Sequence, residues 1–271
     1  MRKFALVALS CIAASAASAG DCKLSKNHTA AVESGQTRRV VVSAGAGDLI
    51  IRGEANRAGV EASGRACASS QKLLDQITIE AHREGDTVYV KSVLPSAVLD
   101  GIRYAQLDLR VFVPEGALLT VEDSSGDLQL SNVQAASVSD SSGDQDIRNI
   151  GGNLEVVDSS GDVRIEGVRG ALKIRDNSGD LIADDVKGDA EVSLDSAGDI
   201  VFKRIGGGVR ILSDSSGDIT ISDVQRDVTI DEDSSGAIRV EGVGGNFSVG
   251  SDGSGGICWQ RVAGQVQIPK Q

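Results

Sequence analysis

The chain has 271 residues, of which 40% are hydrophobic and only 3% aromatic, and 33 of them are glycine. It carries 39 acidic against 27 basic residues, which gives a formal net charge of −12 at pH 7. So acidic a chain is not expected to bind nucleic acid, or anionic lipid through a basic patch.

Residues 1–19 have the pattern of a signal peptide. Arg2 and Lys3 precede the short apolar run FALVALSCIAASAA, and small residues at 17–19 come before an expected cut ahead of Gly20. The run is too short for a stable transmembrane helix, and no later apolar stretch is long enough to span a bilayer. The sequence therefore predicts an exported, soluble protein that is periplasmic, secreted or held at the cell surface.

Residues 20–116 are predicted to be rich in β-strands with irregular turns. The stretch AGAGDLIIRG (44–53) reads as one corner and a strand, and QITIEAHREGDTVYVKSV (76–93) as two strands around a turn. A long strand, a Pro-Glu-Gly turn and a second strand are expected over 105–123. The one candidate helix is short and lies around 68–76.

Residues 117–271 repeat one short unit. A Ser-Gly or Ala-Gly corner recurs every 17 to 19 residues, at Gly126, Gly143, Gly161, Gly179, Gly198, Gly217, Gly236 and Gly255. Apolar residues follow each corner with the alternation of two short strands. So short a unit cannot bury its apolar side alone, but stacked units can. The repeat predicts an all-β fold, a right-handed parallel β-helix (β-solenoid) with about 18–19 residues per turn. We expect 20–116 to cap one end, since an open end exposes unpaired backbone.

The recurring pattern SGDIxIxxVxGxxxIxxDSSGD, with GDLIIRG and LDLRVFVPEGALLTVEDSSGDL in the front half, resembles the bacterial β-strand-repeat adhesin family. This family is a domain of unknown function related to auto-transporter adhesin heads. The resemblance covers about residues 40–268. It implies a β-helical fold and a place in the cell envelope, and it carries no catalytic residues over to this chain.

Two columns of aspartates accompany the corners. One precedes each glycine, at Asp123, Asp140, Asp158, Asp176, Asp195, Asp214, Asp233 and Asp252, and the other follows it, at Asp127, Asp144, Asp162, Asp180, Asp199 and Asp218. The simplest interpretation is turn chemistry, in which Asp and Ser bond the backbone of their own corner and Gly adopts a positive φ. The sequence thus predicts a line of acidity along one edge, which is where a cation or a basic partner would bind.

Two alternatives remain open. Carboxylates on adjacent turns could supply the oxygens that calcium prefers, as in a calcium-stabilised β-roll, although the GGxGxDxUx repeat of such rolls does not recur. Paired acids could also cleave a polysaccharide. However, an active site is a local departure from a repeat, and the two histidines, His28 and His82, both lie outside the repeat. We expect no enzyme, no catalytic or metal-binding residue and no cofactor, but a scaffold that contacts an envelope protein or a glycan.

Three cysteines remain after the predicted cleavage, at positions 22, 67 and 258. If the front part caps the near end, Cys258 lies seven turns away, roughly 34 Å at 4.8 Å per turn. A disulfide needs Cα atoms within about 7 Å. The sequence therefore predicts a Cys22–Cys67 disulfide, with Cys258 free or bonded to another molecule.

Overall fold

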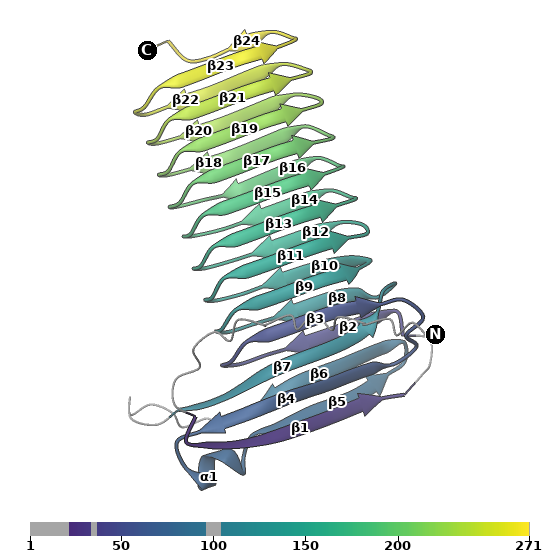
Figure 1. Ribbon diagram of the computed structural model, residues 1–271. Coiled ribbons are helices and arrows are strands. Elements are labelled where there is room, and N and C mark those ends of the chain that lie inside the picture. The colour runs from purple at the N-terminus through teal and green to yellow at the C-terminus, as the bar shows by residue number, and fades with distance from the viewer. Residues whose placement is uncertain (1–21, 34–36, 96–103, 271) are drawn as a thin grey trace, which may run out of the picture.

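The computed structural model describes residues 22–33, 37–95 and 104–270, and consists of two 12-stranded sheets and one short helix (Figure 1). The predicted signal peptide, 1–19, lies outside the described residues. Within the described part of the chain, no helix combines the length and apolar character needed to cross a membrane. The predicted all-β solenoid is confirmed, and its right-handed sense stays a prediction.

The first sheet holds twelve strands, and only the first four of them lie in space in an order that differs from their order in sequence. From the N-terminal end they are β1 (Leu24–Val32), β4 (Val60–Ala68), β7 (Ala105–Pro114), β3 (Leu49–Glu54), β9 (Leu128–Val133), β11 (Gln145–Ile150), β13 (Val163–Val168), β15 (Leu181–Val186), β17 (Ile200–Ile205), β19 (Ile219–Val224), β21 (Ile238–Val243) and β23 (Ile257–Val262).

The second sheet faces the first across the core. From the same end its strands are β5 (Thr78–Glu84), β6 (Thr87–Val93), β2 (Arg39–Ser43), β8 (Leu118–Glu122), β10 (Ala135–Ser139), β12 (Leu154–Val157), β14 (Leu172–Arg175), β16 (Ala190–Leu194), β18 (Val209–Asp214), β20 (Val228–Asp233), β22 (Phe247–Asp252) and β24 (Val266–Gln267).

From β8 onward the chain alternates between the sheets and pairs in parallel with the turn before it. Residues one turn apart lie opposite each other, so that Ile219 of β19 pairs with Ile238 of β21, and Val224 with Val243. All four side chains are buried. Each turn adds its apolar residues to the same columns, which together form one continuous core between the sheets.

In the strands of the first sheet, the inward apolar residues are first two and then three positions apart. A residue with a left-handed backbone conformation explains the longer step. In β11, Asn149 has a φ of +56° and is skipped in the pairing with β13. This one residue breaks the alternation, so Ile147 and Ile150 both point inward although they are three positions apart. Asn, Asp and Gly tolerate this conformation best, and they hold five of the six equivalent positions from β9 to β19.

The strands of the N-terminal part belong to the same two sheets as the repeat. Strands β2 and β3 form one turn directly below β8 and β9, and β6 and β7 lie below that turn. The corner expected at 44–53 is present, because Gly47 has a φ of +120° and lies against Gly126. Hydrogen bonding is therefore continuous across residue 116, where the sequence pattern changes.

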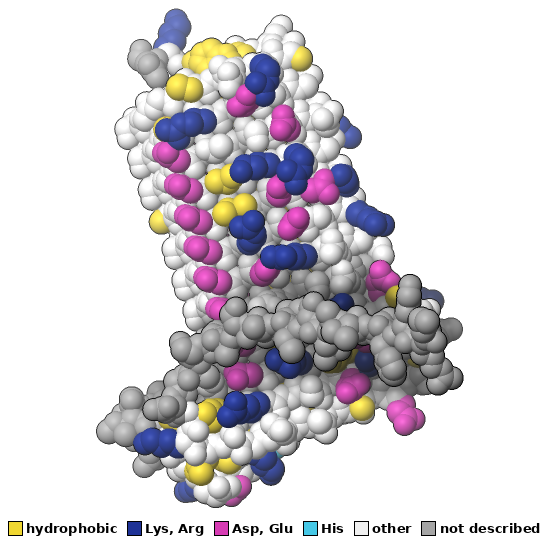
Figure 2. Space-filling model, viewed as in Figure 1, with side chains coloured by type: hydrophobic (Ala, Val, Ile, Leu, Met, Phe, Trp, Pro, Cys, Tyr) yellow, Lys and Arg dark blue, Asp and Glu magenta, His cyan; other side chains and the backbone are white. Residues whose placement is uncertain are grey.

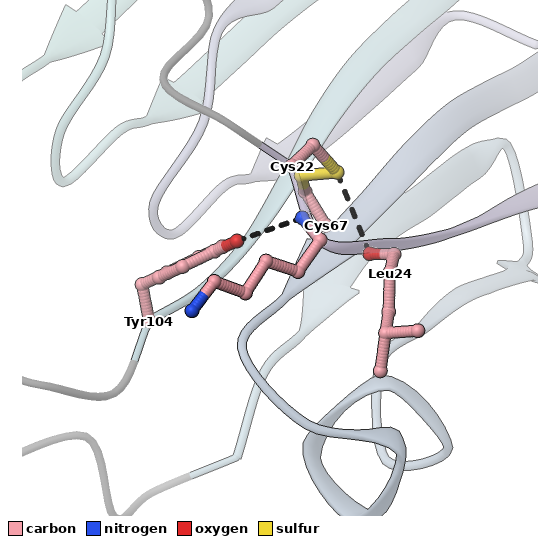
Figure 3. Close-up of a disulfide and its surroundings, with 5 residues drawn as sticks. Cys22, Leu24, Cys67 and Tyr104 are labelled. Carbon is pink, nitrogen blue, oxygen red and sulfur yellow. Dashed lines mark hydrogen bonds between the residues drawn. A yellow bond between two sulfur atoms is a disulfide. The ribbon is translucent and has the colours of Figure 1, made fainter.

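Antiparallel strands close the N-terminal end of both sheets. Strand β4 pairs antiparallel with β7 and with β1, and β5 pairs antiparallel with β6. The expected short helix is α1 (Gln71–Leu74), which Ser70 caps by accepting a hydrogen bond from the N–H of Leu73. A disulfide joins Cys22 to Cys67, whose Cα atoms are 5.7 Å apart (Figure 3). Beside it, the N–H of Lys23 donates to the hydroxyl of Tyr104 at 3.0 Å.

Candidate functional site

The repeated corner places an aspartate on each side of a glycine. From Gly126 to Gly255 the corner glycines have φ values between +115° and +142°. They also pack against the backbone of the turn below: a Cβ on Gly161 would lie 2.1 Å from the carbonyl oxygen of Gly143. No other residue type fits here, so the glycines hold successive turns in close backbone contact and keep the aspartates in register.

The inner column consists of the aspartates that precede the glycines. Seven of them are buried, with at most 5% of their surface exposed: Asp123, Asp140, Asp158, Asp176, Asp195, Asp214 and Asp233. The eighth, Asp252, lies in the last turn and is partly exposed. The prediction that this column lies along an exposed acidic edge is wrong, because the side chains turn into the space between the sheets.

Hydrogen bonds satisfy only part of the inner column. One oxygen of Asp140 accepts from the N–H groups of Ser141 and Ser142, at 2.7 and 3.3 Å, as the turn interpretation predicts. Its other oxygen is buried without a partner. At Asp195 and Asp214 the backbone N–H groups of the corner lie near the carboxylate, but neither carboxyl oxygen makes a hydrogen bond of regular geometry. An ionised carboxylate in such a place is unfavourable, since the lost contacts with water are not replaced.

Burial raises the pKa values of the seven buried aspartates in the inner column. Burial, helped by the charge of a neighbouring aspartate, raises the pKa of Asp158 and Asp195 to about 7 and that of Asp214 and Asp233 to about 6. Burial likewise raises the pKa of Asp123 to about 7. A protonated carboxyl carries no charge, so protonation removes most of the cost of burying it. These five carboxyls therefore take up protons at a much higher pH than a carboxyl that is exposed to water.

The outer column consists of the aspartates that follow the glycines, and it lies at the surface. Each carboxylate accepts a hydrogen bond from the backbone N–H of the equivalent residue one turn on, as when Asp180 donates to Asp162 at 3.0 Å. The same bond, between 2.8 and 3.3 Å, is made by every member: Asp48, Asp127, Asp144, Asp162, Asp180, Asp199 and Asp218. Asp48 belongs to this column, whose first predicted member was Asp127; the corner at 44–53 was expected, and its AGAGD has the same pattern as the later corners.

These bonds leave one oxygen of each outer carboxylate free of the backbone. Figure 2 shows a line of acidic side chains along one edge of the solenoid. At Asp218, the N–H of Ala237 and the guanidinium of Arg239 hold the pKa below its ordinary value. Arg239 lies 2.7 Å from the second oxygen of this carboxylate. The column can therefore accept a cationic group with its free oxygens while its own geometry stays fixed.

The corner serines connect turns rather than satisfying their own corner. The hydroxyl of Ser160 donates to the carbonyl of Ser141, and that of Ser178 to the carbonyl of Ser159, both at 3.2 Å. The sequence interpretation expected such bonds within one corner. Stacked strands are only about 4.8 Å apart, so the groups of the next turn are within easy reach.

The opposite edge of the solenoid, where the first sheet bends into the second, carries a shallow polar groove. Its cavity volume is about 680 Å³, and its lining includes Asn132, Gln134, Asn149, Arg169 and Lys187. The lining residues provide hydrogen-bond donors and acceptors but no aromatic ring on which a sugar could stack.

The remaining candidate residues do not form a reactive group. His28 lies in β1 and His82 in β5, where the latter stacks on Tyr89. Among the residues that the structure describes, no set of three or more His, Cys, Asp or Glu side chains is arranged to hold a metal ion. Cys258 is free and exposed in β23.

Comparison with solved structures finds distant similarity along most of the chain. A "putative lipid binding protein" from Parabacteroides distasonis is 14% identical with a TM-score of 0.44, and a "putative adhesin" from Bacteroides fragilis is 12% identical with a TM-score of 0.39. Both comparisons cover 90% of this chain and 97% of the other. A "putative cell adhesion protein" from Clostridium sporogenes is 12% identical, with a TM-score of 0.30 and coverage of 91% and 100%. None of the three names is that of an enzyme, and similarities this distant say nothing about what the chain binds.

Comparison with curated proteins found no match. A family model does match, over residues 12–241, and its description is "Toastrack DUF4097". The match spans most of the chain, including the front turn formed by β2 and β3 and the repeated corners as far as Gly236. The resemblance to the β-strand-repeat adhesins is thereby confirmed, and the chain belongs to the toastrack family DUF4097.

Proposed function

We propose that this protein is an exported, non-enzymatic interaction module of the cell envelope, an adhesin or scaffold that contacts a basic partner protein through its outer aspartate column. The observation that carries the proposal is the fixed geometry of that column. Each carboxylate is held by the backbone of the next turn and still has an oxygen to offer.

Electrostatics favours a basic partner at this edge. Like charges one turn apart repel each other by about 0.9 kcal/mol in water, if Coulomb's law is scaled to 4.8 Å. A partner with a matching row of Lys or Arg side chains would remove this repulsion. Because the carboxylates are already ordered, binding would cost little side-chain entropy, and the row of charge would also speed association.

The other features agree with this reading. The acids of the outer column repeat in successive turns from Asp48 to Asp218, as a scaffold requires, whereas an active site would be confined to one or two turns. The Cys22–Cys67 disulfide is of the kind that persists in oxidising compartments, which supports export together with the signal peptide expected at 1–19.

The proposal is tested by removing the charge and keeping the shape. A variant with Asn at Asp127, Asp144, Asp162, Asp180 and Asp199 retains the acceptor oxygen for each inter-turn hydrogen bond. Binding of the labelled variant to an envelope fraction of the producing bacterium is compared with that of the wild type at low and high salt. We expect binding to fall at least tenfold at low salt and to lose its salt dependence.

A matched control neutralises five exposed acids in the N-terminal part: Glu61, Asp75, Glu80, Glu84 and Asp86. This variant has the same net charge, so binding close to that of the wild type is expected. Equal losses in the two variants would show that only the net charge matters and would refute the proposal. Undiminished binding by the first variant would refute it as well.

A further inference from the structure

The two ends of the solenoid are finished differently. Antiparallel strands and α1 close the N-terminal end, whereas the last turn at the other end is made of β23 and β24 (Figure 1). Strand β23 pairs only with β21, and β24 only with β22. The outer edges of both strands therefore present backbone N–H and C=O groups that no described strand pairs with, and such an edge is a template for another strand.

The apolar core is also only partly covered at this end, where Val262 and Ile268 pack against it. Trp259 is 44% exposed, whereas Val240, which occupies the same column one turn below, is 2% exposed. Val266 is 36% exposed, whereas its neighbour Phe247 is fully buried. Figure 2 shows hydrophobic side chains gathered at this end. The indole of Trp259 lies beside the ring of Phe247, with the ring centroids 6.5 Å apart and the ring planes inclined by 51°.

The outer aspartate column does not extend to this end. Its positions in the last two turns are taken by Ala237 and Gly256, and a Cβ on Gly256 would contact nothing within 4 Å. If two such ends met, the outer columns of the two molecules would be separated by these uncharged turns. The repulsion that would otherwise oppose contact between two copies is thus weakened where they would touch.

We propose that a second copy of this chain covers the open end, with its own β23 paired antiparallel to β23 across a twofold axis. Such a contact uses the same surface on both molecules and closes on itself, so it forms a dimer and not a fibre. It continues the first sheet by strand addition. Of the two free edges, β23 is the one long enough to specify a register, with six residues against two in β24.

The alternation of β23 fixes which registers bury the apolar side chains. Opposite residues in an antiparallel pair point to the same face, so inward residues must lie opposite inward residues. A register centred on Cys258 does this, because it places Ile257 opposite the second copy's Trp259. It also places Cys258 opposite the second copy's Cys258, on the outer face, with Cα atoms about 4.5–5.5 Å apart. That distance lies within the range of about 4.4–6.8 Å that a disulfide requires.

Solution mass is the first test of this dimer. Light scattering coupled to gel filtration should give twice the monomer mass for the wild type and the monomer mass for Trp259→Lys. The control is Leu118→Lys, which places the same charge on a side chain that is 41% exposed but lies far from this end in sequence and in the stack. This variant should remain a dimer. Circular dichroism of both variants checks that the solenoid is intact.

A thiol cross-link tests the register without altering the interface. With diamide as oxidant, each Cys258 thiol gives up a proton and an electron, a sulfur–sulfur bond forms between the copies, and diamide is reduced to the hydrazine. We expect a covalent dimer on a non-reducing gel, a Cys258–Cys258 peptide in the digest, and no product from Cys258→Ser. A wild type that stays monomeric at high micromolar concentration overturns the proposal. So does a dimer that survives Trp259→Lys, or one in which Cys258 does not cross-link.

Discussion

The inner and outer aspartate columns have the same residue type, the same spacing and the same corners, but opposite environments. Asp158, three positions before Gly161, is buried, whereas Asp162, directly after the same glycine, is exposed. In the outer column the carboxylates accept backbone hydrogen bonds and stay in contact with water. In the inner column they lose water and gain fewer bonds. The same repeat thus contains one row of exposed carboxylates and one row of buried carboxyl groups whose pKa values are raised.

The largest expected effect is on the pH dependence of the whole protein. The pKa of Asp123, Asp158 and Asp195 is about 7 in the fold, against an ordinary value of 3.8, so the fold holds protons that the unfolded chain has released. This stabilisation is fully present below about pH 4 and is lost as the pH rises through 7. We expect the Tm to be higher at pH 5 than at pH 8 by about 10 °C or more. A change of 1 kcal/mol in the free energy of unfolding shifts the Tm of a chain of this size by about 2–4 °C. Calorimetry that finds the higher Tm at pH 8 would show that ionising the inner column does not destabilise the fold.

The next largest effect is a difference in the free energy of unfolding between variants of the inner and the outer column. Asp195→Asn with Asp214→Asn removes two buried charges and keeps their shape, so the free energy of unfolding at pH 8 should rise by about 2–4 kcal/mol. At pH 5, where these carboxyls are already neutral in the wild type, little change is expected. The matched pair Asp180→Asn with Asp199→Asn, in the outer column, removes only repulsion that salt screens, so it should raise the free energy of unfolding by at most about 1 kcal/mol, and equally at both pH values. Urea titrations of the three proteins at both pH values provide the measurement, and an equal gain from both pairs would contradict the distinction.

The smallest effect concerns a single outer hydrogen bond. Asp162→Ala leaves the N–H of Asp180 without its acceptor and should cost about 1 kcal/mol. Asp162→Asn keeps the acceptor and should restore most of that loss. If urea denaturation shows both variants to be equally destabilised, the carboxylate acts through its charge and not through this bond.

The repeat could be predicted from the sequence because its period and its inward residues are set by local chemistry. Ile219 and Ile221, expected to point inward after Gly217, are fully buried. The burial of the inner column was missed, yet a signal for it was present. Asp158 continues the alternation of Leu154 and Val156, both of which are buried, so period two already places its side chain inside.

The arrangement of the front part could not be predicted in this way. Strands β4 and β7 pair antiparallel across a long stretch of chain, and β6 and β7 lie below β2 and β3. No period in residues 55–116 specifies these partners. They are set by contacts between segments that are far apart in the sequence, which are a property of the whole fold.

The position of β3 has a consequence for how the chain reaches its fold. Asp162 and Asp180, which bond across neighbouring turns of the repeat, are 18 residues apart, whereas Asp48 and Asp127 are 79 apart. Each later turn can therefore be added to the one before it by closing a short loop, but β3 has no partners until the chain has extended through β7 and β9. We expect the front turn, with its high contact order, to limit the folding rate, and the repeat to grow from it as from a template. In kinetic terms, φ-values should be high in β3 and near zero in β21.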